Sequence, residues 1–236
     1  MKKQLIAGLS VATIASILSV STPARAFVLS FGTDGIKFDR DTTVKFTFVK
    51  SQGKAKSTLG IFDATGTQLL KTLFEEEAPA DPEHQTSEGP NAWLGTTANL
   101  KGRSTVDFTF AANTVYTLGL FGTLDGATMP TMFSTSSLNY GNSQQAVFDS
   151  AGGAELVSYS GIASSYQSGK DKLAAYKPVL ISFEDLLGGY WGENGGDFND
   201  FTITAEAVPE PLTIGGLALG GAWLAYNRRR RQSQAN

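Results

Sequence analysis

Apolar and polar side chains alternate along several short segments of this chain. Val44, Phe46 and Phe48 are separated by Lys45 and Thr47, and this repeat of two residues is typical of a half-buried β-strand. Short apolar or alternating runs of the same kind predict further strands. They lie at residues 59–62, 68–74, 106–110, 115–121, 145–148, 179–183 and 201–205.

The segments between these strands have the composition of turns and loops. Residues 63–66, with Asp first and Gly last, separate two predicted strands and indicate a β-hairpin. Longer loops are expected at residues 75–91, 134–143 and 160–172, and helical periodicity is confined to the two ends of the chain. We therefore expect an all-β domain of the β-sandwich or jelly-roll type, flanked by an N-terminal signal helix and a short C-terminal membrane helix.

The first 26 residues have the three-part order of a secretory signal peptide. Two lysines near the start precede an apolar stretch at residues 5–20, and the small residues Ala24 and Ala26 follow at the positions that a signal peptidase reads. We expect cleavage before Phe27. The alternative is an uncleaved N-terminal anchor, for which the apolar stretch is short.

The C-terminal segment, residues 208–236, has a second three-part order. Pro209, Glu210 and Pro211 precede an apolar stretch at residues 212–226. At about 1.5 Å per residue, this stretch forms a helix of about 22 Å, shorter than a hydrocarbon core of about 30 Å. A basic cluster then follows, and it is expected to remain on the cytoplasmic side. The cluster consists of Arg228, Arg229, Arg230 and Arg231.

This order of Pro-Glu-Pro, apolar helix and arginine cluster resembles the PEP-CTERM sorting signal of Gram-negative bacteria. The resemblance implies transient anchoring in the inner membrane, processing by an exosortase and delivery to the cell surface, the outer membrane or the exopolysaccharide matrix. A plain C-terminal membrane anchor is the alternative. The expected partners are therefore signal peptidase and an exosortase, with exopolysaccharide or other surface proteins after export.

The charge of the domain between these signals, residues 27–207, excludes some classes of partner. It contains 12 basic and 21 acidic residues, a net charge of about −9. Such a surface repels nucleic acid and favours divalent cations or basic partners. The chain has no cysteine and one histidine, His84, which argues against thiolate metal sites, most zinc sites and most Ser-His-Asp chemistry.

The acidic residues around a glycine-rich loop near the end of the domain form a candidate metal site. If the strands that flank this loop pair, its two ends meet, and carboxylate and amide oxygens are suitable ligands for Ca²⁺. The alternative is that these residues cap turns by accepting hydrogen bonds from nearby backbone N–H groups. The candidate ligands are Glu184, Asp185, Asp197, Asn199 and Asp200.

The same segment resembles the C-terminal motif of the DUF4114 domain. Residues 183–186 read Phe-Glu-Asp-Leu and residues 197–200 read Asp-Phe-Asn-Asp, with a glycine run between them. Residues 57–63 and 116–121 resemble early strands of that family. The family has no established activity, and the resemblance implies a secreted, adhesive or matrix-associated module. The chain departs from the pattern by an insertion at residues 190–194.

Two functions of different classes are compatible with these observations. The first is a non-enzymatic surface or matrix module, with Ca²⁺ as a stabilising ion and Trp191 as a contact residue for a glycan or a partner protein. The second is a secreted carbohydrate-active enzyme that pairs Glu184 with Glu193 or Asp197 as acid and base. The module requires only a stable fold and the sorting signal, whereas the enzyme also requires a cleft, and we favour the module.

Overall fold

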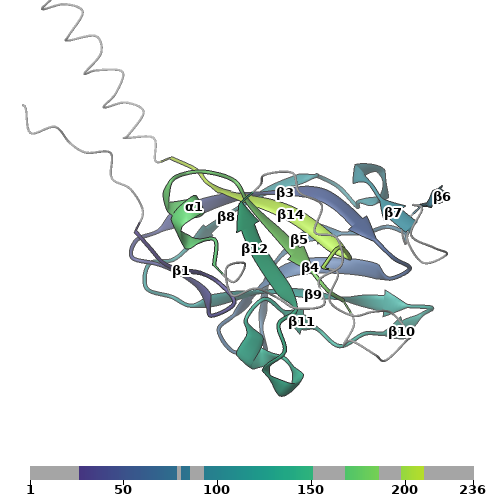
Figure 1. Cartoon of the computed structure of the whole chain (residues 1–236), viewed down its shortest axis with the longest axis horizontal. Coiled ribbons are helices and arrows are strands. Elements are labelled where there is room, and N and C mark those ends of the chain that lie inside the picture. The colour runs from purple at the N-terminus through teal and green to yellow at the C-terminus, as the bar shows by residue number, and fades with distance from the viewer. Residues whose placement is uncertain (1–26, 79–80, 86–92, 151–167, 186–197, 210–236) are drawn as a thin grey trace, which may run out of the picture. The chain divides into compact units, whose positions relative to one another are not determined.

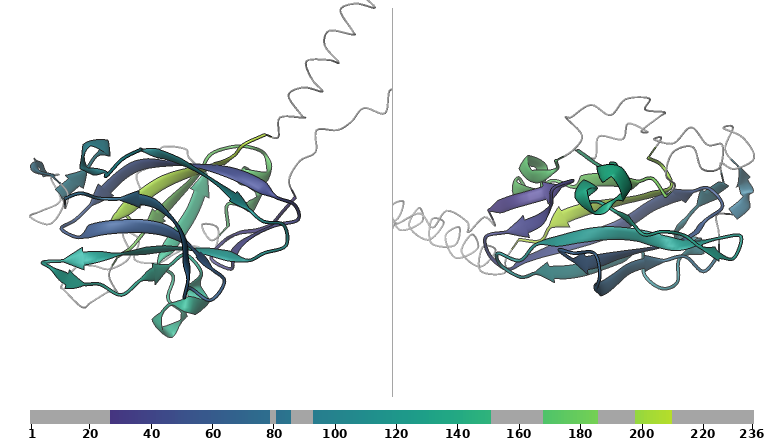
Figure 2. Two further views of the ribbon diagram at one scale, coloured as in Figure 1. Left: turned by 180° about the vertical axis from the view of Figure 1, so that it is seen from behind. Right: turned by 90° about the horizontal axis from the view of Figure 1, so that it is seen from below.

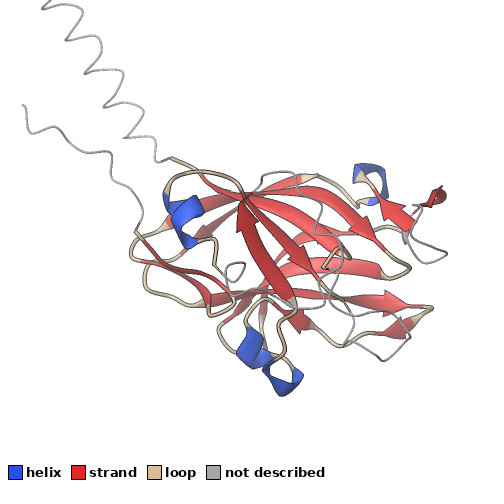
Figure 3. Cartoon of the chain, viewed as in Figure 1, coloured by secondary structure: helices blue, strands red, loops and turns tan. Residues whose placement is uncertain are grey.

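The computed structural model describes residues 27–78, 81–85, 93–150, 168–185 and 198–209. Apart from Pro209, these residues belong to a compact unit that extends from Ala26 to Val208. The described part is dominated by antiparallel strands in two sheets (Figure 1), and its helices are short (Figure 3). The predicted all-β class is therefore confirmed.

The first sheet has the strand order β1-β2-β9-β4-β5, with two short strands, β10 and β11, also paired to β9. Its members are β1 (Val28–Gly32), β2 (Gly35–Phe38), β4 (Lys56–Asp63), β5 (Leu69–Glu75), β9 (Tyr116–Leu124), β10 (Ala127–Thr128) and β11 (Met132–Phe133).

The second sheet has the strand order β12-β13-β14-β3-β7-β6, with β8 also paired to β3. Its members are β3 (Thr42–Gln52), β6 (Asp81–Gln85), β7 (Trp93–Gly95), β8 (Thr105–Phe110), β12 (Ala146–Ser150), β13 (Val179–Phe183) and β14 (Phe201–Ala207). The described helices are α1 (Lys170–Ala174), η1 (Thr97–Asn99), η2 (Ser136–Leu138) and η3 (Tyr140–Asn142).

The alternation along β3 produces the burial that its sequence predicts. Val44, Phe46 and Phe48 are buried in the core, whereas Lys45 and Thr47 between them are half-buried. β3 pairs with both β14 and β8, so its apolar face becomes continuous with theirs. Strand formation here follows from the burial of one face, since successive side chains of a strand point to opposite faces.

One hydrophobic core takes side chains from both sheets. Phe38 of the first sheet packs against Phe110 of the second with ring centroids 5.3 Å apart. Phe31 and Phe148 form a second contact of this kind, with centroids 5.5 Å apart and nearly perpendicular rings. Edge-to-face aromatic pairs add about 0.5–1.5 kcal/mol beyond the burial of their area. The sheets are therefore held to each other by aromatic side chains.

All eight strand segments expected from the sequence are present, but all three of the expected loops contain secondary structure. The loop expected at residues 134–143 contains the short helices η2 and η3. α1 occupies part of the loop expected at residues 160–172 and lies beside β1 (Figures 1 and 2). Its Leu173 is buried, and Gly169 at its start donates a backbone hydrogen bond of 2.9 Å to the Phe31 carbonyl. A five-residue helix with one buried side chain is too short for a helical repeat.

The acidic segment at residues 75–91, which was expected to be a loop, contains strand residues. Glu75 ends β5, and the whole of β6 lies inside this range. β6 pairs with β7 at one end of the second sheet's strand order. An edge strand gains its hydrogen bonds from one neighbour and needs no apolar face, so the polar composition of β6 gave no strand signal.

The two terminal segments carry the predicted export and sorting signals. The expected signal helix at residues 1–26 lies outside the described residues, together with Ala24 and Ala26. The expected apolar helix at residues 212–226 also lies outside them, as do Glu210, Pro211 and the arginine cluster. Among the residues that are described, no helix has the length and apolar character needed to cross a membrane.

Candidate metal centre

The pairing of β13 with β14 brings the two ends of the glycine-rich loop together. The two strands run antiparallel, and Phe183 at the end of β13 lies opposite Phe201 at the start of β14. Glu184 and Asp185, which follow β13, therefore leave the sheet beside Asp200, which precedes β14. The predicted convergence of these ends is confirmed.

Glu184, Asp185 and Asp200 form a close group, which we call the acidic cluster. One carboxylate oxygen of each residue lies within 4.8 Å of those of the other two. The exposed fractions of the three residues are 4%, 4% and 7%. Carboxylates are rarely this buried unless they are paired or bind a cation, so the cluster is a candidate metal centre.

Backbone hydrogen bonds from two neighbouring strands fix the position of Asp200. Its N–H donates to the Phe183 carbonyl at 3.1 Å, and its carbonyl accepts from the N–H of Gln52, at the end of β3, at 3.0 Å. The side chain of Asp200 is fixed as well, because its Oδ2 accepts a hydrogen bond of 2.8 Å from the N–H of Asp185. The cluster is therefore attached directly to the second sheet.

Phe198 determines how the chain enters the cluster. Its φ is 49°, in the left-handed region that side chains with a Cβ rarely adopt. Its side chain is nevertheless 2% exposed, and its N–H donates to Glu184 Oε2 at 3.4 Å. Burial of the ring and this hydrogen bond hold the chain in a turn just before Asp200.

The structure brings together three of the five predicted ligands. Asn199 is half-buried in the turn between Phe198 and Asp200. Asp197 lies outside the described residues, and so does Trp191, the predicted contact residue. Glu193 does too, so neither candidate partner of Glu184 in the enzymatic alternative is described.

The chemistry of the cluster favours a hard divalent cation. Its three side chains offer carboxylate oxygens, which suit Ca²⁺ and Mg²⁺ better than zinc. Three ionised carboxylates at this separation repel one another, and the repulsion is stronger in a buried site than in water. A divalent cation between them would replace this repulsion with attraction. The residues present therefore fit Ca²⁺.

Another buried carboxyl group, that of Glu76, lies outside the acidic cluster and was not predicted from the sequence. Glu76 is 1% exposed, and it accepts hydrogen bonds from the Ser51 hydroxyl and, at 2.7 Å, from the Ser57 N–H. Ser51 belongs to β3 and Ser57 to β4, so the carboxyl group joins the two sheets. One signal was available: Glu76 is two residues after the buried Phe74, and residues two apart in an extended chain lie on the same face.

The environment of Glu76 favours its protonated form. Burial raises the pKa of Glu76 to about 7, although the hydrogen bonds from Ser51 and Ser57 and the charge of Lys56 act in the opposite direction. Desolvation dominates because the charged form loses more solvation on burial than the neutral form does. Glu76 therefore titrates near neutral pH while it holds the sheets together.

No family model, curated protein or solved structure matches this chain. The interpretation of the acidic cluster therefore depends on its geometry and on the sequence pattern around it.

Proposed function

We propose that the chain is an exported, non-enzymatic protein of the cell surface or exopolysaccharide matrix, whose domain is a β-sandwich or jelly-roll-like module stabilised by Ca²⁺. The order of the two terminal signals supports export and sorting by an exosortase-type system. The shared core of the two sheets supports the sandwich class. The observation that carries the calcium site is the acidic cluster, buried where two paired strands meet.

Calcium is the natural stabiliser for such a module. The chain has no cysteine, so disulfides do not stabilise it in the oxidising compartment that it would enter. A cation that binds the folded state and not the unfolded one adds stability by mass action. Millimolar Ca²⁺ outside the cell would then maintain the fold where the protein acts.

Direct binding of Ca²⁺ tests this function. We expect the purified protein to bind one Ca²⁺ per chain in a calorimetric titration, and Asp200→Asn to lose most of the affinity because it removes a charged ligand. Asp125→Asn is the matched control: it makes the same change of charge at an exposed turn between β9 and β10 of the other sheet. Absence of binding to the unmodified protein would refute the calcium site.

A further inference from the structure

Gln145 has a buried side-chain oxygen without a hydrogen-bond partner among the residues that the structure describes. The residue is 4% exposed, and in the described part of the chain no group donates a hydrogen bond to its Oε1. Its Nε2 donates to Ser143 Oγ at 3.0 Å. A buried carbonyl oxygen that accepts no hydrogen bond loses its solvation without compensation, so such atoms are rare and call for an explanation.

The strand register places Gln145 opposite Glu184 of the acidic cluster. Ala146 at the start of β12 lies opposite Phe183 in an antiparallel pair. The pairing continues by one residue, because the Glu184 N–H donates to the Gln145 carbonyl at 3.1 Å. Gln145 and Glu184 are therefore directly opposite, and directly opposed side chains lie on the same face of a sheet with their Cβ atoms about 5 Å apart.

We infer that Gln145 Oε1 is a fourth oxygen ligand of the cation held by Glu184, Asp185 and Asp200. This inference rests on the proposed calcium site and extends it to β12, a strand outside the predicted motif. An amide oxygen is a common ligand of Ca²⁺ and adds no negative charge to a group of three carboxylates. The cation would supply the missing partner of the buried oxygen.

A ligand set of this kind discriminates between cations. Ca²⁺ accepts six to eight oxygens in irregular geometry, whereas Mg²⁺ requires nearly octahedral coordination and retains several waters. The carboxylates offer up to two oxygens each, and the amide adds one more. We therefore expect the site to bind Ca²⁺ more tightly than Mg²⁺, and to lose part of this preference when the amide oxygen is removed.

The test compares Gln145→Met with the unmodified full chain in calorimetric titrations with Ca²⁺ and in thermal melts with chelator. Methionine has a similar length and lacks the carbonyl oxygen. We expect the Ca²⁺ affinity to fall at least about tenfold, the size of effect typical for groups that support a metal. In chelator the variant should melt no lower than the unmodified protein, because the unpartnered oxygen has been removed.

Two further variants separate a ligand from a structural residue. Ser143→Ala removes the hydrogen bond to Nε2 and should leave the Ca²⁺ affinity within about twofold. Gln145→Glu retains an oxygen at the position and should bind Ca²⁺ at least as tightly as the unmodified chain. This variant also provides a test if Gln145→Met fails to fold. Unchanged affinity in Gln145→Met, or lost affinity in Gln145→Glu, would overturn the role of Gln145 while the calcium site stands. No binding by the unmodified chain would refute the calcium site itself.

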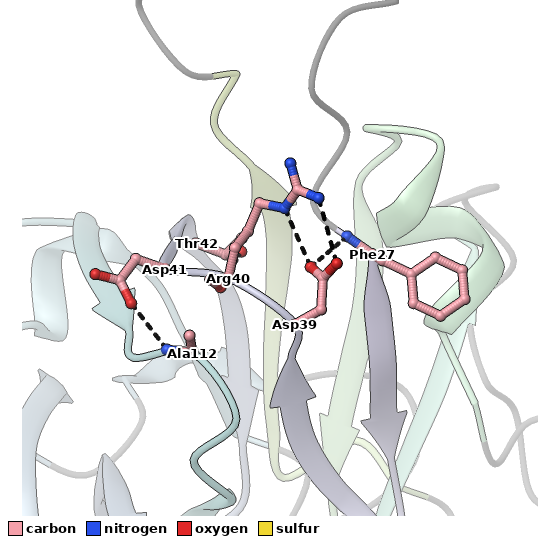
Figure 4. A network of polar contacts seen from close by, with 6 residues as sticks. All are labelled: Phe27, Asp39, Arg40, Asp41, Thr42 and Ala112. Atoms are coloured by element: carbon pink, nitrogen blue, oxygen red, sulfur yellow. Dashed lines mark hydrogen bonds and ion pairs between the residues drawn. The ribbon is translucent and has the colours of Figure 1, made fainter.

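A different observation, at the N-terminal end of the described chain, supports a second inference. The Phe27 N–H donates to Asp39 Oδ1 at 2.9 Å (Figure 4). Arg40 also binds this carboxylate, through Nε to Oδ1 at 3.2 Å and through Nη2 to Oδ2 at 3.3 Å. The hydrogen bond from Arg40, with help from Phe27, holds the pKa of Asp39 below its usual range, so this carboxylate stays ionised.

The geometry points to Asp39 as the carboxylate that receives the α-ammonium of the processed chain. The inference rests on the export and cleavage in the proposed function. Hydrolysis of the peptide bond between Ala26 and Phe27 leaves a carboxylate on Ala26 and an ammonium on Phe27. The N–H that already points at Asp39 then carries a positive charge, and charge-assisted hydrogen bonds are stronger than neutral ones. The contact of Lys170 Nζ with the Phe27 ring, 5.5 Å from its centroid, helps to hold this residue in place.

The exported protein provides the test. We expect mass spectrometry to find Phe27 as its first residue. At about pH 7.5, near the pKa of a free α-ammonium, an amine-reactive reagent should label this terminus several-fold more slowly in the unmodified protein than in Asp39→Asn. Asp41→Asn is the control, because Asp41 accepts a hydrogen bond from the Ala112 N–H instead. An unprocessed chain would refute the proposed export, whereas a Phe27 terminus with equal labelling rates would overturn only the ion pair.

Discussion

Glu76 links the two sheets through one buried carboxyl group. It accepts hydrogen bonds from Ser51 of β3 and Ser57 of β4. Gly95 of β7 makes room for this contact, since a Cβ there would lie 3.2 Å from Glu76 Oε1 and in collision with Ser51 Oγ. A buried polar group with its hydrogen bonds made specifies how the surrounding elements meet, but ionisation makes it costly.

The titration of Glu76 predicts that stability decreases between acid and neutral pH. The folded-state pKa of about 7 lies above the ordinary glutamate value of 4.5, so the folded state retains this proton over a pH range where the unfolded state has released it. The contribution of Glu76 to the free energy of unfolding is therefore fully present below about pH 4.5 and is lost as the pH rises to about 7. At about 1.4 kcal/mol per pKa unit, the loss is about 3 kcal/mol.

Glu76→Gln resembles the protonated form at every pH and should remove this decrease. Denaturant unfolding at about pH 5 and at about pH 8 measures the effect as a change in the free energy of unfolding. Glu75→Gln is the control, because Glu75 is a partly exposed neighbour that pairs with Lys101 on the surface. Equal pH dependence in the unmodified protein and in Glu76→Gln would contradict the assignment.

At the scale of elements, β4 and β9 show why glycine occupies the middle of two strands. Gly60 and Gly119 lie directly opposite each other in this pair. The Phe62 ring occupies the space above Gly119 and makes perpendicular contacts with the rings of Phe121 and Phe133. The glycine is therefore required by close packing of an aromatic ring, and not by an unusual backbone conformation.

This packing predicts unequal costs for alanine at the two glycines. A Cβ at Gly119 would lie 2.7 Å from the Phe62 ring, which its aromatic neighbours hold in place, so Gly119→Ala should cost about 1–3 kcal/mol. At Gly60 the Cβ would first meet the end of Leu69, a side chain that is 42% exposed, and would lie 3.1 Å from the Lys71 carbonyl oxygen, a less severe contact than the one at Gly119. Gly60→Ala should therefore cost less. Equal or reversed losses in chemical denaturation would contradict this explanation.

The sequence predicts elements best where alternation persists. β3, β8 and β14 each present a run of apolar residues on one face, and their predicted positions are confirmed. The elements that were not predicted are short, with at most five residues each: β1, β2, β6, β7, β10, β11, α1 and the three η helices. Their own side chains show no sustained periodic pattern.

The candidate site, like the fold, was predictable where it depends on the strands that the sequence pattern identifies. Glu184, Asp185 and Asp200 were identified because the ends of paired strands meet, which follows from the pattern of β13 and β14. Two features required the structure. The left-handed φ of Phe198 depends on the burial of its ring, and the position of Gln145 depends on the register of β12. Neither has a local signal in the sequence.

At the scale of the whole molecule, the chain combines a folded domain with two terminal signals that the proposed function assigns to export. The compact unit from Ala26 to Val208 contains all of the described strands and the acidic cluster. The net charge of residues 27–207, about −9, is the basis for the expectation that the domain does not bind nucleic acid. The basic residues of the C-terminal cluster are assigned to sorting.

The sorting signal predicts a change of location when its charge is removed. Replacement of the four arginines at 228–231 by glutamine should leave the chain unprocessed at its C-terminal end and absent from the cell surface, because the cluster would no longer hold this end on the cytoplasmic side. Cell fractionation with immunoblotting measures the result, and removal of residues 232–236 is the control. Normal surface delivery of the glutamine variant would contradict the assignment.

The most direct test of the central claim is a thermal melt of the purified protein in chelator and in millimolar Ca²⁺. Ca²⁺ at about 100 times its dissociation constant adds about 2.7 kcal/mol, which for a domain of this size raises the melting temperature by about 5–10 °C. The calcium site predicts this rise in the unmodified protein and in Asp125→Asn, and its loss in Asp200→Asn. Identical melting temperatures with and without Ca²⁺ would contradict it and leave the acidic cluster as part of the connection between β13 and β14.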